Sequence, residues 1–109
     1  MVEHSSHGTF LLQDGDTPRS VAETVYGDGS RYAILLKYNP EQWVPGTRIE
    51  VPNKAGRFTT VEDGEQTRDL IERMFKNQPV HLYLKRYYQW NGMREATDLV
   101  GETVFIPER

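Results

Sequence analysis

Apolar residues recur at helical spacing in two parts of the chain. Each part carries four of them at positions i, i+1, i+4 and i+5: Val21, Ala22, Val25 and Tyr26 in the first part, and Leu70, Ile71, Met74 and Phe75 in the second. Side chains with this spacing lie on one face of a helix and point toward a protein core. We therefore expect helices near residues 18–26 and 67–76.

A second apolar segment with helical spacing follows each of these helices. Thr17 followed by Pro18 is typical of a helix start, and Gly27 is typical of a helix end. We expect the second helices near residues 31–38 and 79–88. Their apolar faces consist of Ile34, Leu35 and Tyr38 in one, and Val80, Tyr83, Leu84, Tyr87 and Tyr88 in the other.

Short segments with alternating apolar residues flank the helix pairs. Phe10 and Leu12 alternate before the first pair, and Ile49 and Val51 alternate after it. Alternation with a period of two indicates a half-buried strand. The order strand, helix, helix, strand then occurs twice, with strands expected near residues 9–13, 48–52, 58–62 and 103–107.

The two parts form an internal repeat. One shift of the sequence aligns three pairs of identical residues: Gly15 with Gly64, Arg19 with Arg68, and Glu23 with Glu72. A larger shift aligns the closing segments "GTRIEVP" (46–52) and "GETVFIP" (101–107), and the polar segment "NKAGR" (53–57) between the copies suits a linker. We predict an α+β fold of two tandem β-α-α-β units, residues 9–52 and 58–107, behind a polar N-terminal tail of residues 1–8.

The first unit resembles a LysM domain. It carries Gly15-Asp16-Thr17 after the first strand, then a Val-Ala helix start, Asn39, Pro45-Gly46 and a closing Ile-x-Val-Pro. The second unit is similar, with Gly64-Glu65-Gln66 in place of Gly-Asp-Thr and Tyr88 where Asn39 would align. The resemblance implies that each unit is a two-stranded antiparallel sheet with two helices on one face.

Many LysM domains bind polymers of N-acetylglucosamine, such as peptidoglycan or chitin, between the loop after the first strand and the loop before the last. The residues of this turn could equally have a structural role. A carboxylate at Asp16 is favoured near a helix N-terminus, and Thr17 can cap that helix. Both interpretations stay open at this point. The resemblance places six candidate glycan-binding residues in this chain: Asp16, Thr17, Pro18, Asn39, Pro40 and Glu41.

The two tryptophans have different expected roles. We expect Trp43 to pack in the core of the first unit. Trp90 lies in "YYQWNGMREATD" (87–98), the stretch that lengthens the second unit, where it fits either a protein contact or a fold back over a small core. The candidate protein-interface residues of this stretch are Arg86, Tyr87, Tyr88, Trp90 and Arg94.

Composition narrows the classes of partner. The chain has 109 residues, which is enough for one compact domain or two very small ones, and it has no cysteine to form a disulfide or a thiolate metal site. The formal net charge of −3 does not favour nucleic acid. No apolar stretch suits a membrane span and the N-terminus lacks a signal-peptide pattern, so we expect a soluble protein that is not secreted by the usual signal.

Catalytic patterns are weak in this sequence. Glu3, His4 and His7 stand close together, but in a polar segment with nothing to fix a metal-binding geometry, and His81 is isolated. "DGD" is too short for a calcium loop, and no nucleophile-elbow pattern is present. We expect a non-catalytic protein without a metal or other cofactor.

Two functions fit these expectations. The resemblance also extends to small LysM proteins of phage tails, baseplates and contractile injection machines. Our first hypothesis is therefore a structural adaptor in a virion tail or baseplate, assembled in the host cytoplasm, whose partners are neighbouring tube, hub or spike proteins. The alternative is a peptidoglycan-binding module.

Overall fold

The computed structural model describes residues 1–109 and confirms the predicted strand pairs. Strand β2 (Gly8–Leu11) pairs antiparallel with β3 (Arg48–Val51), which places Phe10 opposite Ile49. Strand β4 (Gly56–Thr60) pairs antiparallel with β5 (Thr103–Pro107). All four strands lie within a few residues of the expected positions.

Four α-helices connect these strands in the expected order: α1 (Pro18–Tyr26), α2 (Tyr32–Tyr38), α3 (Thr67–Met74) and α4 (His81–Trp90). The start of α1 has the predicted chemistry. The Thr17 hydroxyl accepts a hydrogen bond from the Ser20 amide at 3.1 Å, and the Ser20 hydroxyl accepts one from the Thr17 amide at 2.8 Å. Gly27, with φ of +72°, ends the helix in the left-handed conformation that favours glycine.

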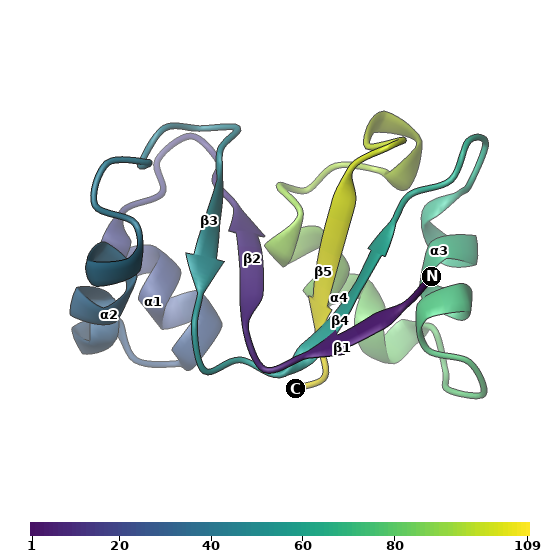
Figure 1. Ribbon diagram of the computed structural model, residues 1–109, viewed down its shortest axis with the longest axis horizontal. Coiled ribbons are helices and arrows are strands. Elements are labelled where there is room, and N and C mark those ends of the chain that lie inside the picture. Colours follow the sequence, from purple (N-terminus) through teal and green to yellow (C-terminus); the bar gives the residue numbers. More distant parts are fainter.

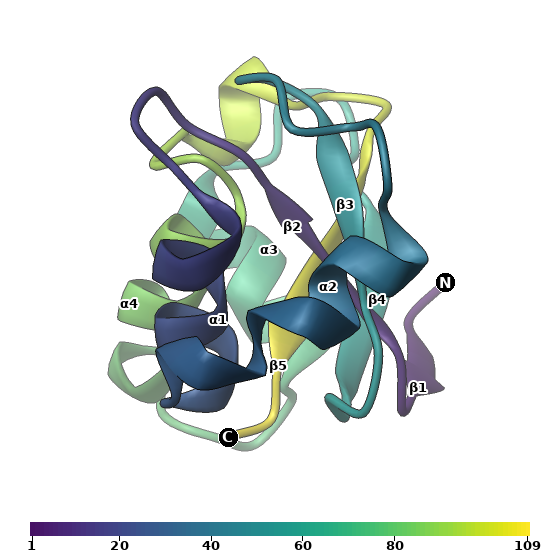
Figure 2. The same cartoon turned by 90° about the vertical axis from the view of Figure 1, so that its left-hand side faces the viewer.

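The elements form an α+β structure with two lobes that lie side by side (Figure 1). The first lobe, residues 8–52, contains β2, β3, α1 and α2, and the second lobe, residues 56–107, contains β4, β5, α3 and α4. Figure 2 shows α1 and α2 at the end of the molecule formed by the first lobe. Strands β2 and β5 are neighbours at the boundary between the lobes.

The expectation of a polar tail at residues 1–8 is wrong. Residues Glu3–Ser5 form β1, which pairs antiparallel with β4 and places Glu3 opposite Phe58. The sheet of the second lobe is therefore three-stranded, in the order β1-β4-β5, and not the expected two-stranded sheet. Val2 packs against the core of the second lobe. The polar side chains of residues 3–5 gave no sign of a strand, which forms because its backbone groups pair with those of β4.

The predicted apolar stripes are buried in two clusters. In the second lobe, Leu70, Ile71, Met74 and Phe75 of the α3 segment pack with residues of α4 and β5. In the first lobe, Val21, Ala22 and Val25 of α1 pack with Phe10 and Ile49, while Tyr26 is only partly buried. Trp90 and Phe105 come from the second lobe in sequence but belong to the cluster of the first lobe.

An aromatic junction joins the two lobes. The ring of Trp90 lies 5.5 Å from that of Phe10 and 5.4 Å from that of Phe105, between ring centroids. Gly8 and Gly56 lie directly against the Phe105 ring, and a Cβ atom would come within 2.4 Å of it at Gly8 and 2.3 Å at Gly56. A side chain at either glycine would displace this ring, so the close contact between the lobes depends on both.

Asn39 and Asn91 have the same structural role in the two lobes. The Asn39 amide group donates to the carbonyls of Leu35 and Glu50, at 3.0 and 2.8 Å. The Asn91 amide group donates to the carbonyls of Tyr87 and Phe105, at 2.9 and 3.1 Å. Asn91 is therefore the counterpart of Asn39, and the alignment that placed Tyr88 there is wrong.

Candidate binding site at the lobe junction

A groove of about 310 Å³ opens where loops of both lobes meet. We call it the junction groove. The first lobe contributes the loop after β2 and the loop before β3, and the second lobe contributes the loop after α4. The lining residues are Leu11, Leu12, Gln13, Asp14, Pro45, Gly46, Gly92 and Arg94.

The loop after α4 approaches β2 closely at Gly92. A Cβ atom there would lie 2.8 Å from Cδ2 of Leu11, and the φ angle of +69° also favours glycine. The next residue, Met93, has a φ of +59°. Asn91 strengthens this approach through a parallel β-bridge to Leu11. The sequence signal for this loop was "NG", which indicated a turn but not its contact with the first lobe.

Two exposed apolar residues are next in sequence to residues that line the junction groove, and two charged residues line it. Val44, beside Pro45, is 59% exposed, and Met93, beside Gly92, is 60% exposed. Arg94 is exposed and forms no ion pair or side-chain hydrogen bond, and Asp14 is an exposed carboxylate in the lining. Two apolar contacts and an arginine around a groove suit a protein or polymer ligand better than a small buried substrate.

Arg48 of the first lobe makes polar contacts with two residues of the second lobe. Its side chain extends from β3, donates to Oδ1 of Asn91 at 3.1 Å and lies 3.7 Å from a carboxylate oxygen of Glu102. Burial lowers the pKa of Arg48, and the Glu102 carboxylate acts in the opposite direction. Sequence analysis missed Arg48 because its position in a strand gave no indication of a partner in the other lobe.

The six candidate glycan-binding residues do not line the junction groove. Asp16 accepts a hydrogen bond from the Gln13 amide at 2.8 Å, Thr17 caps α1, and Pro18 is the first residue of that helix. Asn39 is 0% exposed, and its side chain is fully used in the contacts with α2 and β3. Pro40 and Glu41 are exposed.

Two of the five candidate protein-interface residues point inward. Trp90 is only 2% exposed, and Tyr87 is fully buried, so neither can be an exposed contact in the folded chain. Burial also raises the pKa of Tyr87. The structure therefore corrects the protein-contact interpretation of Trp90: its side chain folds over a core, and that core belongs to the first lobe.

The other three candidates differ in whether their side chains already have partners within the protein. Arg86 donates to the Glu108 carbonyl at 2.9 Å, and the Tyr88 hydroxyl donates to the Glu95 carboxylate at 2.7 Å. Arg94 alone among the candidates lines the junction groove. Trp43 packs against the first core as expected and donates to the Asn39 carbonyl at 2.7 Å.

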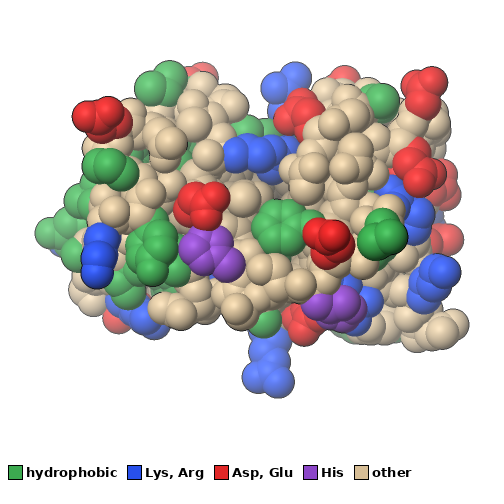
Figure 3. All heavy atoms as spheres, viewed as in Figure 1, with side chains coloured by type: hydrophobic (Ala, Val, Ile, Leu, Met, Phe, Trp, Pro, Cys, Tyr) green, Lys and Arg blue, Asp and Glu red, His purple; other side chains and the backbone are tan.

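The histidines near the N-terminus contact separate partners. His4 lies 3.4 Å from a carboxylate oxygen of Glu108, whereas His7 contacts Glu50. No group of three or more side chains of the kinds that ligate metals lies together in the structure. Figure 3 shows acidic and basic side chains interspersed over one face of the molecule, so a partner on that face meets individual charges and not a large field of one sign.

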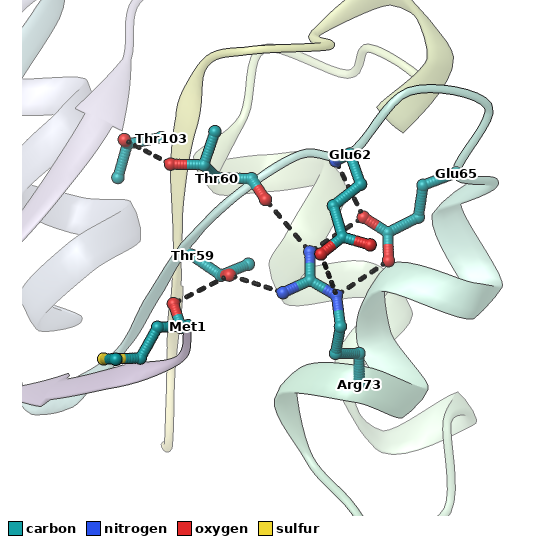
Figure 4. Close-up of polar contacts among 7 residues, drawn as sticks. All are labelled: Met1, Thr59, Thr60, Glu62, Glu65, Arg73 and Thr103. Atoms are coloured by element: carbon teal, nitrogen blue, oxygen red, sulfur yellow. Dashed lines mark hydrogen bonds and ion pairs between the residues drawn. The ribbon is translucent and has the colours of Figure 1, made fainter.

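Arg73 fixes the second-lobe loop that corresponds to the Asp16 turn (Figure 4). It donates to Glu65 at 2.8 and 2.9 Å and to the Thr59 hydroxyl at 2.7 Å. Glu65 in turn accepts from the Glu62 amide, as Asp16 accepts from the Gln13 amide. The carboxylate after each opening strand therefore holds its own turn, which supports the structural interpretation of Asp16.

Glu65→Gln should make the free energy of unfolding less dependent on pH in the acidic range. Hydrogen bonds from Arg73 hold the pKa of Glu65 below its usual range. A lowered pKa stabilises the fold above the pKa of the unfolded chain, about 4.3, and this contribution is lost as the pH falls through the folded-state pKa. Urea unfolding at pH 7 and pH 3 should therefore show a variant that is less stable than the parent at pH 7 and closer to it at pH 3. An equal difference at both values would contradict the assigned role of the pair.

Comparisons with known proteins leave the family open. No protein-family model, curated protein or solved structure matches the chain. None of the helices is both long and apolar enough to cross a membrane. Function is therefore inferred from the residues and their geometry.

Proposed function

We propose that the protein is a non-catalytic structural adaptor built from two tandem LysM-like units. Its partners are neighbouring proteins of a phage tail, a baseplate or a related injection machine, such as tube, hub or spike components. On this proposal the protein is a virion component that assembles in the host cytoplasm. The junction groove, with Val44, Met93 and Arg94 around it, is the partner-binding surface.

The observation that carries this proposal is the composition of the junction groove. Both lobes contribute to it, and Val44 and Met93 remain more than half exposed beside it. Methionine and arginine are both enriched in protein–protein interfaces, and arginine is among the residues that dominate their binding energy. Because the aromatic junction packs the lobes against each other, the two sides of the groove are preorganised, which lowers the ordering cost of binding a partner.

Two equivalent pairs of residues support the tandem-unit part of the proposal. Asn39 and Asn91 each connect the end of the second helix to the last strand of their lobe. Asp16 and Glu65 each accept an amide hydrogen bond across the turn before the first helix. Shared roles at matching places suit two copies of one ancestral unit, even though β1 gives the second sheet a third strand.

Peptidoglycan binding is the second candidate function. The junction groove lies between the loop after β2 and the loop before β3, which is where sugar-binding LysM domains hold their ligand. The assigned glycan residues Asp16, Thr17 and Asn39 are nevertheless occupied by internal hydrogen bonds. A sugar ligand would therefore have to use other residues of the groove, such as Asp14 and Arg94.

The adaptor proposal predicts that Val44→Asp combined with Met93→Asp lowers incorporation into purified tail or baseplate particles at least about tenfold, because each change would bury an unpaired charge in the interface. Leu82→Asp is the matched control, since Leu82 is an exposed apolar residue near the opposite end of α4. The measurement is the amount of protein in the particles, after circular dichroism has shown that both variants fold.

Peptidoglycan co-sedimentation separates the two functions. The adaptor proposal predicts that the purified protein stays in the supernatant with insoluble peptidoglycan. Binding that Arg94→Ala abolishes, together with normal incorporation of the double variant, would contradict the adaptor proposal and favour the glycan-binding module.

A further inference from the structure

The edges of the two sheets differ in how their backbone groups are covered. Every second residue of an edge strand directs its N–H and C=O groups away from the sheet. Asn39 covers the outer edge of β3, where it bonds both the amide and the carbonyl of Glu50. The edges of β2 and β5 meet at the lobe junction, where Asn91 bonds the Phe105 carbonyl and bridges to Leu11. Other parts of the protein therefore contact three of the four edges, through Asn39 at β3 and through Asn91 and the facing lobe at β2 and β5.

Strand β1 forms the fourth edge, and it is open. It pairs with β4 on one side and has no strand on the other. Glu3 and His4 are exposed along it. A strand of only three residues with charged side chains resists indiscriminate pairing, so a partner at this edge needs further contacts.

A groove of about 470 Å³ beside β1 offers such contacts. Val2 and His4 form one wall, and the end of α3 with the residues after it forms another, at Met74 and Lys76. Val2 and Met1 give this groove an accessible apolar part, whereas the Met74 side chain is buried in the core. It is separate from the junction groove, because the two share no lining residue.

Some of the charged side chains around this groove have partners of opposite charge, and one does not. Arg57 lies 3.3 Å from a carboxylate oxygen of Glu108. Arg73 lies 2.8 Å from one of Glu65 and 3.9 Å from one of Glu62, which also lines the groove, so both arginines have carboxylate partners within the protein. Lys76 is exposed and forms neither an ion pair nor a hydrogen bond. Lys76 is therefore the lysine or arginine of this groove whose side chain has no carboxylate partner, and it lies close to an open strand edge.

We propose that the β1 edge binds an extended segment of a partner protein, which adds to the sheet β1-β4-β5 as a fourth strand and carries an acidic side chain that reaches Lys76. Backbone hydrogen bonds supply affinity in this mode of recognition, and alternate side chains supply specificity. Apolar side chains on the same face of the segment contact Val2. This second surface goes beyond the junction groove, and it does not depend on what binds there.

A second copy of the chain is a poor occupant of this edge. When two identical edge strands pair antiparallel about a twofold axis, each residue at the centre faces its own copy. In β1 this places Glu3 opposite Glu3, or His4 opposite His4, depending on the register. Like charges directly opposite each other destabilise a strand pair, which disfavours the register with Glu3 at the centre.

The test uses two blocked heptapeptides, TVTDTVT and TVTKTVT, titrated into the isotope-labelled full chain and followed by nuclear magnetic resonance. We expect the acidic peptide to shift the amide signals of residues 2–5 and of Lys76. It should bind about two- to fivefold more tightly than the basic peptide, as for one exposed ion pair. Lys76→Glu should reverse this preference, and Lys37→Glu, an exposed lysine on α2, should leave it unchanged.

Three outcomes would overturn the proposal. The first is that neither peptide shifts the signals of residues 2–5. The second is equal binding of both peptides by the parent, or an unchanged preference in Lys76→Glu. The third is a dimer in analytical ultracentrifugation whose formation protects the amides of residues 2–4 from hydrogen exchange, which would identify a second copy as the occupant.

Discussion

Trp90→Ala is expected to lower the free energy of unfolding by about 3–5 kcal/mol, which is the cost of removing a large buried aromatic side chain. Trp90 is anchored on α4 but packs on Phe10 of β2 and Phe105 of β5. Its removal leaves a cavity at the aromatic junction between the lobes. Since small proteins have only about 5–15 kcal/mol of stability in total, this change consumes a large part of it.

The measurement is urea unfolding of the parent and of Trp90→Ala, followed by far-ultraviolet circular dichroism. Arg94→Ala is the control, because Arg94 is exposed and makes no ion pair, and its loss should change stability by less than about 0.5 kcal/mol. A similarly small effect of Trp90→Ala would contradict the aromatic junction and return Trp90 to the set of surface contacts.

Phe75→Ala is expected to cost a similar amount, about 3–5 kcal/mol, in the core of the second lobe. Its ring stacks on that of Tyr83 with centroids 3.8 Å apart and planes 11° apart, and the Arg57 guanidinium lies 4.6 Å from its centroid on the ring face. The substitution therefore removes buried area, a ring contact and a cation–π contact at one position.

Thermal unfolding measures this effect directly. For a protein of this size, a loss of 1 kcal/mol lowers the melting temperature by about 4–8 °C, so Phe75→Ala should melt far below the parent. Asp63→Ala, in the exposed turn after β4, should melt close to the parent. Equal melting temperatures for Phe75→Ala and the parent would contradict the helical stripe that both the sequence and the structure assign to residues 70–75.

The parts of the fold that depend on local sequence were predicted well. The segment from Thr17 to Gly27 contains its own start signal, apolar stripe and end signal, and α1 has the expected bounds. The strand β5 was placed by its similarity to the closing segment of the first unit, and it too has the expected bounds. Such signals lie within a few residues of the structure that they specify.

The features that were missed depend on contacts between distant segments. Strand β1 has no apolar alternation, and it forms because β4 offers an edge. The burial of Trp90 depends on Phe10, a residue of the other lobe. Asn91 was misaligned because the second unit contains extra residues before it, and only its bonds to Tyr87 and Phe105 show that it is the counterpart of Asn39.

The candidate sites show the same difference. The turn chemistry of Asp16 and Thr17 was recognised as an alternative to sugar binding, and the structure shows the hydrogen bonds of that alternative. The junction groove was not predicted, because it requires loops from both lobes, and Arg94 is the single candidate residue that lies in it. Only the packing of the lobes determines which exposed residues become neighbours.

Quantitative mass spectrometry of purified tail, baseplate or injection-machine particles from the organism that encodes this chain tests the proposed function most directly. The adaptor proposal predicts that the protein is present at a fixed number of copies per particle and is retained through a high-salt wash. Its absence from such particles, combined with sedimentation of the purified protein with peptidoglycan, would contradict the proposal.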